Sequence, residues 1–251
     1  MNKPVTLPLS QPTAAPKPHR EKVRISDLHA FYGESHILHG IDLRVMQGEL
    51  VTLLGRNGSG RSTTLRAIMK MVGRRSGSIV INGTETLDLP AHRIAHLGLG
   101  YCPEERGIFS SLNVEENLRL PPAVRSDGMT VEQIYEMFPN LYERRFSQGT
   151  RLSGGEQQML ALARILRTGA NILLLDEITE GLAPVIVKRL AEVLVDLKRR
   201  GLTILLVEQN FRFAAPIADR HYVMEHGHIV EEVAAHELEA KTGLLKTYLG
   251  V

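Results

Sequence analysis

The sequence predicts an α/β fold in which helices cover a mostly parallel sheet. Two observations support this prediction. Short apolar runs typical of buried strands alternate with segments of helical periodicity, and 43% hydrophobic and 23% charged residues make an ordinary globular composition. A chain of 251 residues is long enough to bury a large core. No apolar run approaches the ~20 residues of a membrane-spanning helix, so we expect the chain not to cross a membrane by itself.

The first elements read as strands. Alternating apolar residues predict one strand over Val23–Leu28 and a second over Ile41–Val45, which ends at a glycine-containing turn. The run Glu49–Leu54 has the profile of a buried strand. A helix is predicted over Ser62–Val72.

The second half of the chain repeats the strand–helix–strand order. Asn171–Leu175 and Thr203–Val207 are predicted to be buried strands, joined by a helix over Pro184–Arg200. The segment Glu105–Arg151 before them is richer in polar residues and proline. It predicts an inserted helical subdomain, which we place roughly at residues 105–160.

The first twenty residues differ from the rest of the chain. Residues 1–20 contain five prolines and several basic residues, and no acidic residue. Such a stretch has little to bury, so we expect a disordered, proline-rich tail. The remainder, residues 21–251, is predicted to form a single domain.

Charge and cysteine content exclude several classes of function. The formal net charge of +2 is too small to favour nucleic acid as a partner. The single cysteine, Cys102, cannot form an internal disulfide, which favours a reducing compartment and a buried thiol. The ten histidines show no ligand spacing, and His226-Gly227-His228 reads as a hairpin turn, so no histidine metal site is expected.

A glycine-rich loop follows the strand Glu49–Leu54. The residues expected to bind nucleotide phosphates are Gly55, Arg56, Asn57, Gly58, Ser59, Gly60, Arg61, Ser62 and Thr63. The glycines let backbone N–H groups point at phosphate oxygens, and the helix that follows adds its positive N-terminal end. The pattern is that of the Walker A loop of P-loop NTPases, although the same stretch taken alone is also compatible with a turn that binds nothing.

Two features of this loop bear on its chemistry. Ser62 is placed to bind Mg²⁺, as the Walker A hydroxyl does. Arg61 stands where lysine is usual, and its planar guanidinium keeps the charge but is bulkier than an ammonium.

The strand Asn171–Leu175 is followed by two carboxylates. Because ligands bind where the carboxyl ends of parallel strands meet, Asp176 and Glu177 are expected beside the glycine-rich loop. Asp176 is predicted to hold Mg²⁺ and Glu177 to activate a water molecule as general base. Two acids after a strand, taken alone, are also common in solvated turns.

A third motif precedes an apolar helix. It consists of Leu152, Ser153, Gly154, Gly155, Glu156 and Gln157. A hydroxyl and free amides at a helix N-terminus form a second anion site, which one bound nucleotide does not require within the same chain. The motif therefore predicts a two-fold dimer in which each chain contacts the γ-phosphate bound by its partner.

These motifs resemble those of the ATP-binding subunits of ABC transporters. The run LSGGEQQ is similar to their signature motif nearly letter for letter, and the resemblance covers the chain from about Val23 onward. It implies ATP and Mg²⁺ as cofactors and a P-loop NTPase fold. That fold has a RecA-like mostly parallel sheet, an N-terminal antiparallel β subdomain and an inserted α-helical subdomain.

The resemblance also assigns single residues. It implies that Tyr32 stacks on adenine, although an ordinary core aromatic is the alternative. Glu104 falls in the loop that senses Mg²⁺ and faces the membrane subunits, where glutamine is usual. Glu180 and Gly181 lie in the D-loop, and Gln209 occupies the position at which many relatives have a switch histidine.

Within the family, the runs GRNGSG, EGLAP and VEQN resemble the LivF branch, which serves branched-chain amino acid importers. Glu104 and Gln209 are usual in that branch. Arg61 departs from it, and so does Ile178, which stands where proline is expected. Arg61 bears more on the rate of hydrolysis than on nucleotide binding, and Ile178 gains an N–H that proline lacks.

The resemblance implies an ATPase subunit at the cytoplasmic face of the cell membrane. We expect a homodimer, or a heterodimer with a LivG-like ATPase, docked to two membrane permease subunits and served by a solute-binding protein. The expected substrate is a branched-chain or related amino acid. The alternatives are an importer ATPase for another small solute such as urea, a weakly hydrolysing regulatory module, and a repair or translation ATPase, for which 251 residues leave little room.

Overall fold

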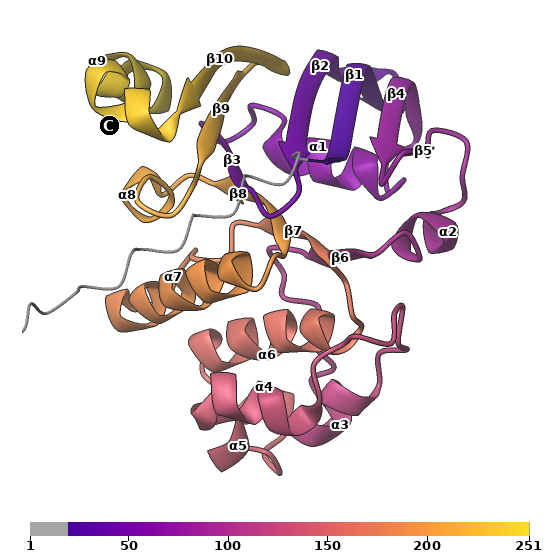
Figure 1. The fold of residues 1–251 in the computed structure, drawn as a ribbon, viewed down its shortest axis with the longest axis vertical. Coiled ribbons are helices and arrows are strands. Elements are labelled where there is room, and N and C mark those ends of the chain that lie inside the picture. The colour runs from indigo at the N-terminus through magenta and orange to yellow at the C-terminus, as the bar shows by residue number, and fades with distance from the viewer. Residues whose placement is uncertain (1–19, 251) are drawn as a thin grey trace, which may run out of the picture.

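A computed structural model describes residues 20–250 and shows two sheets with helices packed around them (Figure 1). The predicted tail, residues 1–20, lies outside the described residues except for Arg20. Within the described part, no helix has the length and apolar character needed to cross a membrane.

The smaller sheet is antiparallel, with the order β2-β1-β4-β5. Its strands are β1 (Glu21–Tyr32), β2 (Ser35–Met46), β4 (Arg74–Ile81) and β5 (Thr84–Glu85). β1 and β2 extend beyond the predicted ranges, because the pairing between them continues through bulges instead of stopping. One irregularity follows Ile25, where Asp27 adopts a left-handed φ of 48°.

The larger sheet has the order β10-β9-β3-β8-β7-β6. Its strands are β3 (Leu50–Gly55), β6 (Leu99–Cys102), β7 (Ile172–Asp176), β8 (Thr203–Glu208), β9 (Arg220–Glu225) and β10 (His228–Ala234). Neighbouring strands are parallel except for the hairpin β9–β10, which turns at His226-Gly227 as predicted. The predicted α/β fold with an antiparallel sheet and a mostly parallel sheet is confirmed.

The central strands are buried on both faces, and alternate residues serve two separate parts of the core. Ile172 and Leu174 of β7 pack with the antiparallel sheet and with α1 (Arg61–Ile68). Leu173 and Leu175 pack on the opposite face, against α6 (Gly154–Arg167) and α7 (Pro184–Arg199). A strand with both faces covered needs apolar residues at every position, which explains the unbroken apolar runs of β3, β7 and β8.

The remaining helices lie around these layers. They are α2 (Ala91–Ala95), α3 (Val114–Arg119), α4 (Val131–Met137), α5 (Pro139–Glu143), α8 (Phe211–Ala214) and α9 (Leu238–Leu249), with 3-10 turns at Gly149–Arg151 and Ala235–Glu237. Helices α3 to α6 gather at the end of the molecule away from the antiparallel sheet (Figure 1). The division into a single domain with an inserted subdomain at 105–160 stays a prediction.

Helix α1 ends earlier than the sequence suggests. It was predicted to run to Val72, but it stops at Ile68. Lys70 adopts a left-handed φ of 57°, which a helix cannot contain, and the chain then enters β4. Met71, one of the apolar residues that extended the prediction, is exposed.

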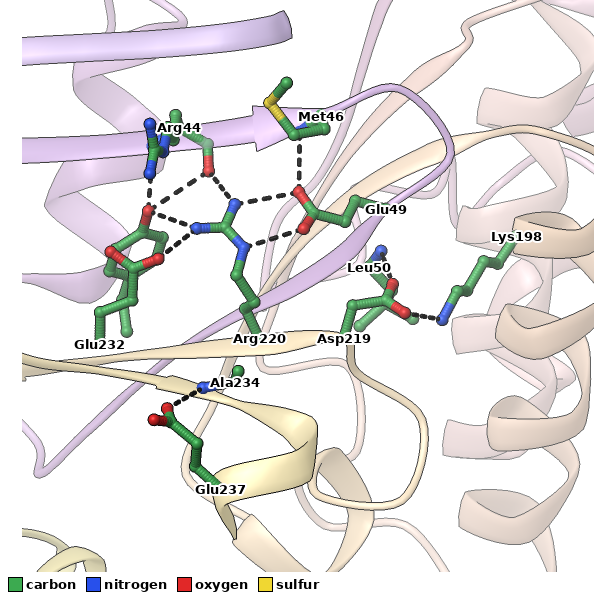
Figure 2. A network of polar contacts seen from close by, with 11 residues as sticks. Arg44, Met46, Glu49, Leu50, Lys198, Asp219, Arg220, Glu232, Ala234 and Glu237 are labelled. Carbon is green, nitrogen blue, oxygen red and sulfur yellow. Dashed lines mark hydrogen bonds and ion pairs between the residues drawn. The ribbon is translucent and has the colours of Figure 1, made fainter. Parts of the chain in front are cut away.

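A partly buried arginine joins the two sheets. Figure 2 shows Arg220, at the start of β9, bonded to the Glu49 carboxylate through Nε at 2.8 Å and Nη2 at 3.0 Å. Nη2 also donates to the Arg44 carbonyl of β2 at 2.8 Å, and Nη1 contacts Glu232 of β10. These bonds raise the pKa of Arg220, because its charged form is the one they stabilise.

Replacement of Arg220 by Met is expected to lower the free energy of unfolding by about 2 kcal/mol, because Glu49 is left mostly buried without its cation. The measurement is urea unfolding followed by circular dichroism. Arg24→Met, which breaks the exposed pair between Arg24 and Glu21, is the control and should cost less than about 0.5 kcal/mol. Equal effects of the two variants would show that the Arg220 network does not join the sheets energetically.

A buried carboxyl group holds the turn after β7. Glu208 ends β8 and is 2% exposed. Its carboxylate accepts hydrogen bonds from the Thr179 backbone N–H at 3.2 Å and the Thr179 hydroxyl at 3.0 Å. Burial nevertheless raises the pKa of Glu208 to about 7. Two hydrogen bonds therefore connect the carboxyl end of β8 to the turn that begins at Glu177.

This raised pKa predicts a pH-dependent stability. Between pH 4.5, the ordinary value, and about 7, the Glu208 carboxyl ionises in the unfolded chain but stays protonated in the folded chain. The stability that it contributes is full below pH 4.5 and is lost as pH rises toward 7, a change of about 3 kcal/mol.

Urea unfolding of the wild type and of Glu208→Gln at pH 4.5 and pH 8 measures this change. The wild type is expected to lose more stability than the variant over this interval, by the amount given above. The exposed Glu192→Gln serves as control and should follow the wild type. A Glu208→Gln profile parallel to the wild-type profile would contradict the assignment.

Candidate active site

A cleft of about 440 Å³ opens at the carboxyl ends of β3 and β7. It is lined by Tyr32, Ile37, Asn57, Gly58, Ser59, Gly60, Arg61, Ser62, Thr63, Glu104, Glu177 and Glu180. The structure thus brings together most of the residues that the sequence assigned to nucleotide and metal binding. They come from the antiparallel sheet, the loop before α1 and the ends of strands β6 and β7.

The glycine-rich loop is held in shape by its neighbours. Gly60 has a φ of +105°, and a Cβ there would lie 2.9 Å from a methyl group of Leu38. Only glycine meets both conditions without strain. The Ser59 carbonyl accepts a hydrogen bond from the N–H of Gly227 at 2.9 Å, so the β9–β10 turn supports the loop from outside. The N-terminus of α1, which starts at Arg61, faces the cleft.

Ser62 and Asp176 form a hard-oxygen pair suited to Mg²⁺. The Ser62 hydroxyl donates to Asp176 Oδ1 at 2.8 Å, and the Tyr101 hydroxyl donates to Oδ2 at 3.2 Å. Asp176 is fully buried, and that burial raises the pKa of its carboxyl. A hydroxyl and a carboxylate, with waters and phosphate oxygens as further ligands, fit the needs of Mg²⁺.

Glu177 contacts the arginine of the glycine-rich loop. Its Oε1 lies 2.7 Å from Arg61 Nη2, which also donates to the Asn57 side chain at 3.1 Å. Burial raises the pKa of Glu177, while the charge of Arg61 acts in the opposite direction. Glu177 has a left-handed φ of 47°, and its N–H is bonded to the Val207 carbonyl. The carboxylate is therefore held at the mouth of the cleft by both its backbone and its partner.

Two further carboxylates make the cleft acidic at one side. Glu104, after β6, and Glu180 both line it. The pKa of Glu104 is raised by burial and then by the negative charge of Glu180. The structure does not bring the Glu104 carboxylate into the Ser62–Asp176 pair by any hydrogen bond within the described residues, so its predicted metal role stays a prediction.

Some predicted residues lie beside the cleft instead of lining it. Gly55 is buried, and a Cβ there would lie 2.5 Å from the Met224 carbonyl oxygen. Glycine at this position therefore allows β3 to pack closely against β9. Arg56 is exposed and outside the cleft. Gln209 lines a neighbouring hollow together with Glu177 and Glu180.

The signature motif does not reach this cleft. Ser153 caps helix α6: its Oγ accepts from the Glu156 N–H at 3.3 Å, and Glu156 accepts from the Ser153 N–H at 2.7 Å. Gly155 packs so closely that a Cβ would lie 2.9 Å from Ile186. Gln157 accepts from Arg106 at 2.8 Å. Leu152 is buried, and none of these residues lines the cleft of its own chain.

The sequence did not indicate three residues that shape the site. Ile37 lines the cleft, Tyr101 bonds Asp176, and Glu208 holds the turn after Glu177. Glu208 could have been found, because it ends a buried strand as Asp176 does. Ile37 and Tyr101 carry no such signal, since their positions depend on how the two sheets pack.

Strand pairing gathers four histidines that are scattered in the sequence. His29 Nδ1 lies 3.1 Å from His36 Nε2, and the ring of His39 lies 4.0 Å from that of His36 and stacks with that of His228 at 5.1 Å. Among the described residues, however, no group of three or more histidine, cysteine or acidic side chains has a geometry that could hold a metal. Cys102 is buried as predicted, and burial raises the pKa of its thiol to about 12.

Comparison with known proteins agrees with this geometry. Residues 38–180 match the family described as ABC transporter. The chain is 40% identical over 223 residues to the high-affinity branched-chain amino acid transport ATP-binding protein BraG of Pseudomonas aeruginosa. This alignment covers 88% of this chain and 96% of BraG. It is 36% identical to a probable branched-chain amino acid transport ATP-binding protein, LivF, of Archaeoglobus fulgidus, with 91% and 99% of the two chains covered.

Two further similarities extend this comparison. The lipopolysaccharide export system ATP-binding protein LptB of Haemophilus influenzae is 33% identical, with 87% of this chain and 93% of LptB covered. A solved ATP-binding subunit of an ABC transporter is 26% identical, with a TM-score of 0.76 and with 92% of this chain and all of that chain covered. The segment of this chain that matches the family contains the glycine-rich loop, Asp176 and Glu177. On this evidence the chain belongs to the ABC transporter family, as one of its ATPases.

Proposed function

We propose that this chain is the ATP-binding and ATP-hydrolysing subunit of an importer for branched-chain or related amino acids. The observation that carries the ATPase mechanism is the cleft in which the glycine-rich loop meets Glu177, with the buried Asp176 bonded to Ser62 behind the cleft lining. The similarity to BraG at 40% identity supports the amino acid substrate. The solute itself is recognised by other chains, and this chain supplies the work of nucleotide binding and hydrolysis.

Each residue has a role that follows from its position. The amides of the glycine-rich loop and the guanidinium of Arg61 hold the phosphates. Ser62 and Asp176 hold Mg²⁺, which would neutralise phosphate charge when bound. Glu177 takes a proton from the attacking water. A carboxylate with a raised pKa is well suited to this task. Tyr32, at the open side of the cleft and 40% exposed, stacks on the adenine.

The complete site needs a second chain. The signature residues do not line the cleft of their own chain, and Ser153 caps a helix of 14 residues whose N-terminal amides suit an anion. We place this end of α6 over the γ-phosphate bound by a partner, in a homodimer or in a heterodimer with a LivG-like chain. Glu180 and Gly181 would lie at the seam, and Gln209 beside Glu177. The ATPase dimer would dock on two permease subunits at the cytoplasmic face of the membrane, and a solute-binding protein would deliver the solute to the permeases.

Two alternatives have observations in their favour. The match to LptB leaves room for an ABC transporter of another substrate, and a small solute such as urea is a further candidate. A weakly hydrolysing regulatory module is favoured by the Arg61–Glu177 ion pair, which occupies the general base. The ATPase rate of the dimer with its permeases separates this module from a working hydrolase.

Replacement of Glu177 by Gln is expected to lower kcat for ATP hydrolysis about 10²- to 10³-fold, because water loses its base. Phosphate release at saturating ATP measures this rate, and ATP binding should persist. Glu192→Gln, an exposed carboxylate on α7, is the matched control and should keep the wild-type rate. A Glu177→Gln rate equal to that of the wild type would contradict the role of Glu177.

Mixing two inactive variants tests whether the signature motif works on the partner. Arg61→Ala disables the phosphate site, and Gly154→Asp places a negative charge beside Arg106 at the start of α6. A mixed homodimer has one site with both defects and one intact site. The mixture should therefore recover about a quarter of the wild-type ATPase rate. Mixed dimers without any recovered activity would place the motif outside the partner's site.

A further inference from the structure

The ion pair between Arg61 and Glu177 joins two groups that the proposed reaction needs apart. Arg61 is 4% exposed, and its Nη2 is shared between Glu177 Oε1 at 2.7 Å and Asn57 at 3.1 Å. Glu177 is 14% exposed at its side chain. A pair so shielded from water is stronger than a surface pair, and separating it requires a competing anion.

The same guanidinium has an unused donor. Arg61 Nη1 is buried and has no hydrogen-bond partner within the described residues. A buried charged donor without an acceptor is unfavourable, because its lost hydration is not replaced. Arg61 lines the cleft together with the glycine-rich loop, so a group that enters the cleft can approach its guanidinium. A phosphate meets this need, since it offers several oxygens to the planar fork of arginine.

A phosphate in this loop competes with Glu177 for Arg61. It carries more negative charge than a carboxylate and also accepts from the backbone amides of the loop, which Glu177 does not contact. An arginine drawn to the phosphate leaves Glu177 with weaker bonds to its cation. The carboxylate is also a poorer base while it is paired with a guanidinium, because the pairing stabilises its ionised form.

We propose that Arg61 is a restraint on Glu177 which the bound nucleotide releases. In the nucleotide-free chain Arg61 holds the general base in an ion pair. When the phosphates of a nucleoside di- or triphosphate enter the loop, they take over the guanidinium and free the carboxylate to meet water. This inference rests on the proposed ATPase function and assigns Arg61 a positioning role in addition to phosphate binding.

The restraint predicts that Glu177 opposes nucleotide binding through Arg61. Calorimetric titration with ADP in the presence of EDTA measures this effect without hydrolysis and without Mg²⁺. Glu177→Gln is expected to bind ADP about tenfold more tightly than the wild type, because the phosphates no longer compete with a charged partner. Glu180→Gln is the matched control: it removes one charge from the same cleft, has no bond to Arg61, and should change affinity less than about threefold.

A second background isolates the role of the arginine. In Arg61→Gln, which lacks the cation but can still hydrogen-bond Glu177, the added change Glu177→Gln should have no more effect than Glu180→Gln. Thermal unfolding by circular dichroism confirms that each variant is folded. The comparison of Glu177→Gln with Glu180→Gln in the wild-type background decides the question even if Arg61→Gln does not fold.

Equal gains in ADP affinity from Glu177→Gln and Glu180→Gln would overturn the restraint, because the effect would then be general charge repulsion. A large gain from Glu177→Gln that persists in Arg61→Gln would overturn it as well. Failure of the proposed function looks different, since the wild-type chain itself would then bind no ADP. A wild type that binds ADP but shows neither selective effect keeps the proposed function and loses only the restraint.

Discussion

The burial of the central strands on both faces is the constraint on which the rest of the molecule depends. β3, β7 and β8 carry no exposed residue, and their alternate side chains pack into two separate parts of the core. Strands enclosed in this way lie parallel, and parallel strands deliver their carboxyl ends to one edge. Asp176 and Glu208 are the last residues of such strands, and the glycine-rich loop and Glu177 follow directly, so the packing of the core assembles the site.

Polar groups buried at this edge form a connected set. Asp176 is satisfied by two hydroxyls, Glu208 by the turn after Glu177, and Glu177 by Arg61. The raised pKa values of Asp176 and Glu177 share one cause, burial, which is the condition that makes nearby cations and phosphates most effective.

Arginine in place of lysine changes the number of hydrogen-bond donors that this position offers to Glu177 and to phosphates. A lysine ammonium offers one nitrogen, whereas the fork of Arg61 has one nitrogen for Glu177 and another that lacks a partner in the part of the chain that the structure describes. The departure at Arg61 therefore need not weaken the site, because the same side chain can serve the carboxylate before a nucleotide binds and the phosphates afterwards. Ile178, the other departure, is buried in the core beside the turn that Glu208 holds.

The sequence by itself determined the fold class and the linear motifs. Apolar runs, glycines at fixed spacing and acids at strand ends are local signals, and they were sufficient to predict the parallel sheet, the glycine-rich loop and the place of Asp176 and Glu177 beside that loop. Tertiary structure alone decided that Ile37 and Tyr101 belong to the site and that Arg61 reaches Glu177. The physical reason is that these contacts join residues far apart in the chain, and their distances depend on how whole layers pack, which no local pattern encodes.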